Sequence, residues 1–237
     1  MSRAALAAAA LALLVAPVVA PAQSQERQAG IGSFEFQAGR YLPAIDSEFI
    51  MPPGVAAPWE TSFGTTRRWL FKARGGKAIF RGYGTLELGA GAGYFSAKGS
   101  ARFADGTVSA EQTGFKLVPL SLDLTYRLDL VFERLGVPLV PYGRIALLRD
   151  HWWVTGAGGS ASESGVTSGW GWGGGLGLVL DFIDPTLARE LDRDSGIKHT
   201  MVVVEVAKTN VNDFGSTKSW DLSNDGLLLT FGLMFAF

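Results

Sequence analysis

Residues 227–237 read LLLTFGLMFAF, and apolar or aromatic side chains recur in this segment at every second position. The recurring positions are Leu227, Leu229, Phe231, Leu233, Phe235 and Phe237. The positions between them include the small residues Thr230, Gly232 and Ala236. Successive side chains of a strand point to opposite faces, so a period of two predicts a β-strand with one oily face.

The first residues of the chain have the layout of a secretory signal peptide. Arg3 supplies one positive charge, residues 4–15 form an uncharged apolar run, and Ala20-Pro21-Ala22 is a small-x-small cleavage site. A membrane anchor is the alternative, but prolines break this short run before it could span a bilayer. We expect cleavage after Ala22, which leaves residues 23–237 as one domain.

The composition excludes several classes of protein. Residues 23–237 keep 20 of the 21 basic residues and all 22 acidic ones, for a net charge of about −2 and no basic stripe. Nucleic-acid binding therefore has no electrostatic basis. The chain has no cysteine, which excludes thiolate metal sites and thiol nucleophiles, and we expect neither a metal nor a cofactor. Residues 23–237 contain no apolar run long enough for a membrane-spanning helix.

Alternating patterns predict eight strands. They cover residues 31–42, 67–80, 84–97, 115–132, 139–154, 168–182, 200–210 and 226–237. In the segment 115–132, seven apolar residues from Val118 to Leu130 alternate with five polar ones from Ser121 to Asp129. A helix would distribute both kinds around its circumference, so this segment cannot be an amphipathic helix.

The fold class follows from which face meets solvent. The leucines of 115–132 would overfill the interior of an eight-stranded barrel, whereas Gly, Thr and a few charges fit it. The sequence predicts an all-β fold, a transmembrane antiparallel up-and-down β-barrel of about eight strands, with a soluble sandwich as the alternative. Long connections are expected outside the cell, at 41–66, 98–114, 155–167 and 211–225. The turns at 81–82 and 133–138 are short.

One longer connection, residues 184–194, predicts a short periplasmic helix. Asp184 can cap it, Pro185 suits its first turn and Gly196 suits its end. Leu187 and Leu191 lie four residues apart on one face. This helix is either a periplasmic plug or partner-docking element, or a solvated insert whose leucines cover the inner mouth of the barrel.

Charged residues on the polar faces of the strands form a predicted network in the lumen. They are Glu35, Glu87, Asp123, Arg127, Asp129, Asp181 and Glu205, with Arg144 a less clear member. Charges inside a narrow barrel must be paired or wetted, so we expect ion pairs centred on Arg127 that fill the lumen. The alternative is a gated pore, which would favour cations because acidic groups outnumber basic ones.

Aromatic residues near the strand ends predict an interfacial girdle. Its expected members are Tyr94, Trp152, Trp153, Trp170 and Trp172. Contact with a lipid or glycan is the alternative role. A lipid-modifying enzyme is a third possibility, because His151 is followed in the next loop by Ser160, Ser162, Glu163 and Ser164, residue types that a nucleophile and base require.

The segment 227–237 resembles the closing strand of bacterial outer-membrane barrels, in which the terminal aromatic strand is the signal for the assembly machinery. That resemblance assigns Phe231, Phe235 and Phe237 to this signal. It implies a location in the outer membrane of a Gram-negative cell, with outer-membrane lipid and the barrel-assembly machinery as partners.

A second resemblance covers most of residues 23–237. The segments Asp181–Pro185, Leu191-Asp192 and Gly196–Thr200 resemble an uncharacterised family of small outer-membrane barrels from myxobacteria. Shorter matches are 94–97, 119–120, 126–127, 140–142, 214–215 and 232–237. This family implies no activity. The expected function is therefore structural or interactive, through a charge-filled lumen and external loops with an unknown partner. A porin-like channel for ions or small solutes is the alternative.

Overall fold

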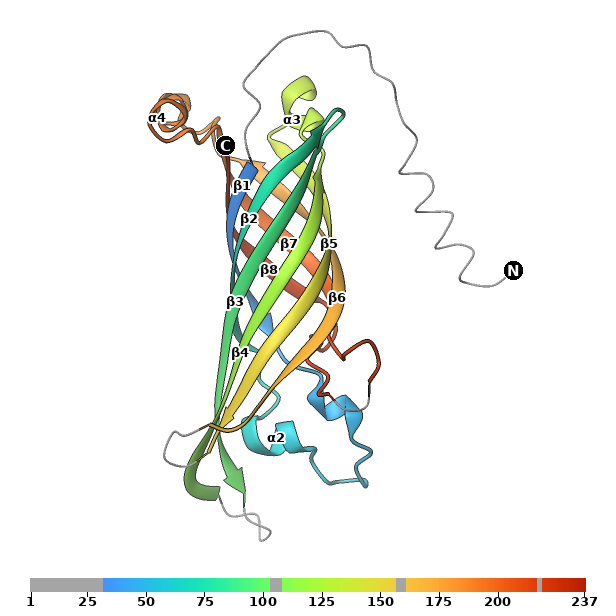
Figure 1. Ribbon diagram of the computed structural model, residues 1–237. Coiled ribbons are helices and arrows are strands. Elements are labelled where there is room, and N and C mark those ends of the chain that lie inside the picture. The colour runs from blue at the N-terminus through green and yellow to red at the C-terminus, as the bar shows by residue number, and fades with distance from the viewer. Residues whose placement is uncertain (1–31, 103–107, 157–160, 217–218) are drawn as a thin grey trace, which may run out of the picture.

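The computed structural model describes residues 32–102, 108–156, 161–216 and 219–237. The predicted signal peptide, residues 1–22, lies outside this part of the chain. Figure 1 shows a tilted barrel, with long connections at one end and with α3, α4 and Phe237 at the other. These ends are called the loop end and the turn end.

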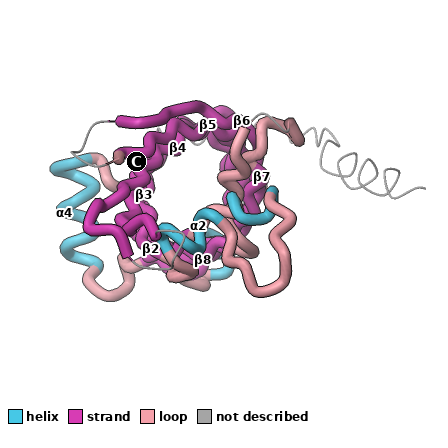
Figure 2. The backbone as a smooth tube through the Cα atoms, turned by 90° about the horizontal axis from the view of Figure 1, so that it is seen from below, coloured by secondary structure: helices cyan, strands magenta, loops and turns pink. Residues whose placement is uncertain are grey.

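Eight antiparallel strands close the barrel, and each pairs with its neighbours in sequence. They are β1 Gly32–Tyr41, β2 Arg68–Arg81, β3 Thr85–Arg102, β4 Val108–Arg127, β5 Leu139–Thr155, β6 Ala161–Val179, β7 His199–Asn210 and β8 Leu228–Ala236. Closure is made by β8 on β1, where Phe36 faces Leu233. Figure 2 shows the resulting ring from its loop end. The predicted eight-stranded barrel is confirmed.

Three predicted segments differ from the observed strands. The segment 168–182 is shifted, because β6 begins at Ala161, within the expected external loop 155–167, and ends at Val179. The segment 115–132 is a strand only as far as Arg127, because Leu130–Leu135 forms α3, which ends at Gly136 in the left-handed region. In the other direction β3 and β4 pair beyond Ala97, so much of the expected external loop 98–114 is a projecting hairpin.

The outer surface carries an apolar belt around the barrel. On β4 and directly after its end it comprises Leu120, Leu122, Leu124 and Leu128, and on β8 Leu229, Phe231 and Leu233, all of them at least 37% exposed. The inward positions of the same strands hold Thr125, Asp123 and Thr230, which are at most 3% exposed. A closed barrel with apolar residues outside and polar ones inside satisfies its backbone internally and exposes its oily face to lipid.

The helix α4, Pro185–Ser195, has the predicted boundaries. Asp184 accepts hydrogen bonds from the backbone N–H groups of Thr186 and Leu187, both at 3.0 Å, and Gly196 ends the helix at φ 71°. Figures 1 and 2 both place α4 beside the barrel wall. The expectation that it plugs or covers the inner mouth is therefore wrong, because the chain leaves β6 outward. At the mouth, Phe132 of α3 packs edge-on against His199.

Two short helices lie at the loop end. They are η1, Ile45–Glu48, and α2, Pro58–Phe63. Asp46 joins them, because its carboxylate accepts hydrogen bonds from the backbone N–H groups of Trp59 at 2.7 Å and Glu60 at 2.9 Å. This connection places the buried indole of Trp59 in the mouth of the barrel, against the ring of Phe115.

Candidate functional site

The barrel interior contains an ion-pair network whose first centre is Arg74 on β2. Its Nη2 lies 2.7 Å from Asp123 Oδ1, and its Nε donates to the same carboxylate at 2.9 Å. Its Nη1 lies 3.3 Å from Glu87 Oε2. All three side chains are at most 6% exposed, so the pairs are desolvated and their charges must compensate one another.

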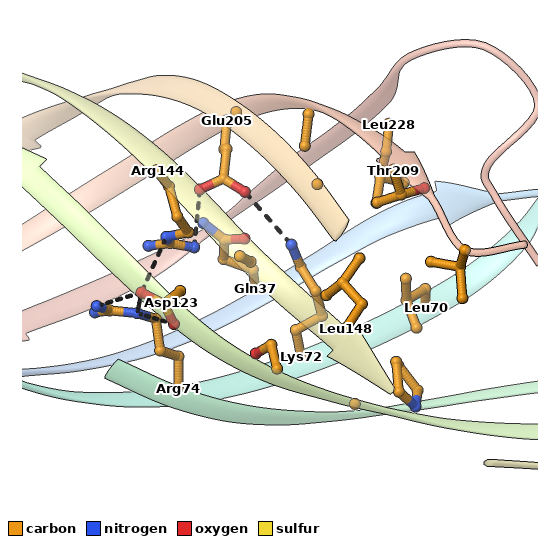
Figure 3. Close-up of a pocket in the computed structure, with 18 of the residues that line it drawn as sticks. Gln37, Leu70, Lys72, Arg74, Asp123, Arg144, Leu148, Glu205, Thr209 and Leu228 are labelled. Atoms are coloured by element: carbon orange, nitrogen blue, oxygen red, sulfur yellow. Dashed lines mark hydrogen bonds and ion pairs between the residues drawn. The ribbon is translucent and has the colours of Figure 1, made fainter. Parts of the chain in front are cut away.

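Arg144 on β5 is the second centre. Its Nη2 lies 2.6 Å from Glu35 Oε2, and its Nη1 lies 2.9 Å from Glu205 Oε2. Its Nε donates to the Thr125 hydroxyl at 2.9 Å, which in turn donates to Asp123 at 2.9 Å. Asp123 and Thr125 therefore connect the two arginines into one network, which Figure 3 shows in part.

Arg127, the predicted centre, lies at the turn end of the network. Its Nη1 is 2.9 Å from Glu87 Oε1, and its Nε is 3.4 Å from Asp129 Oδ1. The prediction of a lumen network is thus right for Glu35, Glu87, Asp123, Arg127 and Glu205, with Asp129 at its edge, but the network is centred elsewhere. The turn-end mouth beyond it is a vestibule of about 710 Å³ lined by Asp129, Phe132 and His199 among others.

Asp181 does not belong to the lumen network. It lies in the turn after β6, where its carboxylate is 2.6 Å from His199 Nδ1 and accepts the backbone N–H of Thr200 at 3.2 Å. The prediction was wrong because β6 ends at Val179, two residues before Asp181. The pair holds the start of β7 at the turn end.

Glycines provide the space that the network occupies. A Cβ on Gly89 would lie 2.3 Å from Arg74 Nη2, and a Cβ on Gly76 would lie 2.8 Å from Arg74 Nη1. On β6, a Cβ on Gly175 would lie 2.5 Å from the ring of Tyr142. The glycines of β3 and β6 therefore leave room for the large polar side chains that the neighbouring strands direct inward.

An aromatic plug, defined here as Trp59, Phe63, Phe95, Phe115, Trp152 and Trp220, fills the loop end of the lumen. Trp152 and Trp220 stack at 4.2 Å between ring centroids with 12° between planes. Phe115 is fully buried and meets Trp59 edge-on at 5.1 Å. Segments from α2 and from the β7–β8 connection thus enter the barrel and close it.

The plug corrects one prediction for the interfacial girdle. Trp152 is 6% exposed and faces the interior, whereas Trp153, Trp170 and Trp172 face outward and are 36–50% exposed. Tyr94 also faces outward, at 48% exposure. Successive residues of β5 point to opposite faces. Ile145 and Leu147 point to lipid, so the even-numbered residues of this strand, including Trp152, point inward.

The residues that suggested a lipid-modifying enzyme as a third possibility are not brought together in the part of the chain that the structure describes. His151 stacks on Trp153 at 6.5 Å, and its register partner on β6 is Val166. Glu163 faces Val154 and Ser164 faces Trp153 in the same register, and no hydrogen bond joins either of them to His151 in the described chain. Ser160 and the side chain of Ser162 lie outside the described residues.

Residues 32–102, 108–156, 161–216 and 219–237 hold neither a metal-binding cluster nor a membrane-spanning helix. No group of three or more His, Asp or Glu side chains there is arranged to hold a metal ion. None of the helices in this part of the chain is long and apolar enough to cross a membrane.

Comparison with solved structures gives the same architecture. The outer membrane protein OprG of Pseudomonas aeruginosa matches with a TM-score of 0.50 and 10% identity, over 88% of this chain and 96% of that chain. The fold is that of a small outer-membrane β-barrel. At 10% identity this match shows the fold alone, and that fold is the one expected for the predicted location in the outer membrane of a Gram-negative cell.

Weaker matches include Neisserial surface protein A, with a TM-score of 0.45 and 13% identity over 88% of this chain and 98% of that one. Ail, the attachment invasion locus protein of Yersinia pestis, matches with a TM-score of 0.37 and 11% identity over 89% of this chain and all of that one. No family model matches, and no curated protein matches. The myxobacterial family therefore stays a prediction, as does the assembly role of Phe231, Phe235 and Phe237.

Proposed function

We propose that this protein is a closed outer-membrane barrel that acts through its external loops and does not conduct. The observation that carries the proposal is the double closure of the lumen. The ion-pair network around Arg74 and Arg144 crosses the middle, and the aromatic plug fills the loop end. An eight-stranded barrel is only wide enough for its side chains to fill, so two filled layers leave no continuous aqueous path.

The external loops offer a surface for a partner. Residues 49–58 read FIMPPGVAAP and contain no charge. Phe49 is 43%, Ile50 103% and Val55 51% exposed. The segment is held at both ends, because Ile45 and Trp59 are buried and Asp46 bridges η1 to α2. Exposed apolar surface on a fixed support is typical of a site that another protein covers. We propose an apolar groove of a protein outside the cell as its partner.

Single-channel recording in planar bilayers tests the closure. Refolded wild-type protein, shown to be folded by its heat-modifiable migration in SDS gels, is expected to give no stable conductance. The double variant Arg144→Ala with Trp152→Ala removes the cation that joins Glu35 to Glu205 and a ring of the aromatic plug, and is expected to open a cation-selective path, because carboxylates then predominate. Arg149→Ala, on the outer face of the same strand, is the matched control and should stay silent.

A stable wild-type conductance that Arg144→Ala alters would refute the closed barrel and favour the ion or solute channel. The vestibule and the space on the loop side of the network would then be the two halves of its path.

A further inference from the structure

Between the network and the aromatic plug lies a cavity of about 120 Å³. Its apolar walls include Leu70, Leu117, Leu148 and Leu228. Figure 3 shows the charged groups at one end and Leu70, Leu148 and Leu228 toward the other. At about 30 Å³ for each water molecule in the liquid, a space of this size would hold roughly four water molecules. Because an apolar cavity of about 150 Å³ is large enough for benzene, this one accommodates an organic molecule of about four or five heavy atoms.

Asp150 of β5 borders this cavity and differs from the other lumen carboxylates. It is 4% exposed, and its Oδ1 has no hydrogen-bond partner. It takes part in none of the ion pairs formed by the described residues, whose lumen members all lie in the network. Its register partners are Pro119 and Thr167, and the Thr167 hydroxyl is already engaged with Ser219 at 2.7 Å.

The network has no spare cation for Asp150. Its cations are Lys72, Arg74, Arg127 and Arg144, and its carboxylates are Glu35, Glu87, Asp123 and Glu205, with Asp129 at its edge. Lys72, which lines the cavity, is occupied by Glu205, with Nζ 3.5 Å from Oε1. In its ionised form Asp150 would add a buried negative charge that the network does not neutralise, and such a charge is costly unless it meets a cation.

We propose that this cavity binds a small organic ammonium ion, with its charged nitrogen on the Asp150 carboxylate and its apolar body against Leu70, Leu117 and Leu148. The combination of one carboxylate and an apolar wall selects this class. A metal ion would need several oxygen ligands, and the described residues hold no such cluster. A neutral apolar molecule would leave the carboxylate unpaired. This site would add the binding of a small ligand to the proposed role of the protein as a closed barrel.

Entry to the cavity passes the aromatic plug, so exchange in the folded barrel is expected to be slow. The experiment therefore supplies the probe during refolding. Wild-type protein is refolded into lipid nanodiscs with isopropylammonium or with the uncharged isopropanol, desalted, and analysed for retained probe by mass spectrometry. Folding is verified by heat-modifiable migration for each sample.

Wild-type protein is expected to retain about one isopropylammonium per barrel and little isopropanol. Asp150→Asn keeps the shape but removes the charge, and should weaken retention by about tenfold or more, as expected for a charge-assisted hydrogen bond. Leu148→Trp keeps Asp150 but fills the cavity, and should also abolish retention. Asp184→Asn, outside the barrel, is the matched control and should retain the probe.

Three results would overturn the proposal. They are absence of isopropylammonium from folded wild-type protein, equal retention by Asp150→Asn, and equal retention of isopropanol. Retention of Na⁺ or Ca²⁺ that depends on Asp150, with none of the ammonium, would replace the organic ligand by a metal ion. Retention of the probe does not depend on conductance. The two experiments can therefore refute the binding site and the closed barrel independently.

Discussion

Arg74 and Asp123 pair across an intervening strand. Arg74 belongs to β2 and Asp123 to β4, and both Nε and Nη2 of the arginine lie within 2.9 Å of Asp123 Oδ1. The guanidinium passes over Gly89 of β3, which is the register partner of Asp123. The contact thus ties together strands that share no backbone hydrogen bonds and fixes the curvature of the wall around the network.

Removing one charge of this pair should destabilise the barrel. Asp123→Asn leaves Arg74 buried with reduced compensation, and breaking a buried pair costs about 3–5 kcal/mol. Asp150→Asn is the matched control, because that carboxylate has no cation among the described residues, and it should leave stability unchanged or raise it. Urea unfolding from lipid vesicles, followed by tryptophan fluorescence, measures both. Equal losses of stability in the two variants would show that pairing with Arg74 does not stabilise the barrel.

The space above Gly89, which the guanidinium of Arg74 occupies, should also be required for the stability of the barrel. In Gly89→Ala the new Cβ would lie 2.3 Å from Arg74 Nη2, so the guanidinium must move away from Asp123. Overpacking of this kind costs about 1–3 kcal/mol. Gly75→Ala on the adjacent strand has nothing within 4 Å of the new Cβ and is the control. The same unfolding assay should show a loss for Gly89→Ala alone; a comparable loss for Gly75→Ala would indicate a general intolerance of alanine.

The barrel wall could be predicted from sequence because alternation is a local property. In β8 and β4 the parity of the leucines and phenylalanines defined both the strand and its lipid face. Asp123, Arg127 and Glu205 were found because they share the opposite parity of the same strands. Arg74 and Lys72 were missed because their strand is interrupted by Gly75-Gly76, which weakens the pattern, although the pairing of β2 is continuous through both glycines.

The plug and the cavity could not be predicted in this way. The plug is made partly by Trp59 and Trp220, which lie in connections without periodicity, and their position depends on contacts across the mouth. The unpaired state of Asp150 likewise depends on what lies opposite it in three dimensions. Trp152 is different, since the parity of Ile145 and Leu147 already indicates that it points inward.

Replacing Trp152 or Trp153 by alanine should lower the stability of the barrel by different amounts. Trp152→Ala removes a buried ring stacked on Trp220 and should cost about 3–5 kcal/mol. Trp153→Ala removes an outward ring that is 36% exposed and should cost about 1 kcal/mol. Circular dichroism provides a second readout, because two stacked indoles produce an exciton signal that only Trp152→Ala should abolish. An unchanged signal in that variant would contradict the stacked plug.

Glu48 should make the apolar loop sensitive to pH. Partial burial raises the pKa of Glu48, and the charge of Asp221 adds to the effect, while a hydrogen bond from the Asp221 backbone opposes it. A raised pKa in the folded state means that this contribution to stability is present below the ordinary Glu value and is lost as the pH rises through the folded value. The protection factors of residues 49–58, which are corrected for the intrinsic pH dependence of amide exchange, should therefore be higher near pH 4 than near pH 7. Glu48→Gln should remove the difference, and a persistent difference would assign it to another group.

The belt on β4 should define the depth of the barrel in the membrane. Leu122 is 52% exposed and lies near the middle of the outward series, so Leu122→Arg places a charge near the bilayer centre. An arginine there costs about 2–4 kcal/mol, falling to about 0–1 kcal/mol near the interface. Val118→Arg, on the same face of the same strand and next to Lys116, is the control near that interface. Unfolding from vesicles should separate the two variants by about 2 kcal/mol. Equal costs would mean that this face does not cross the hydrocarbon core, and the membrane-spanning orientation would have to be abandoned.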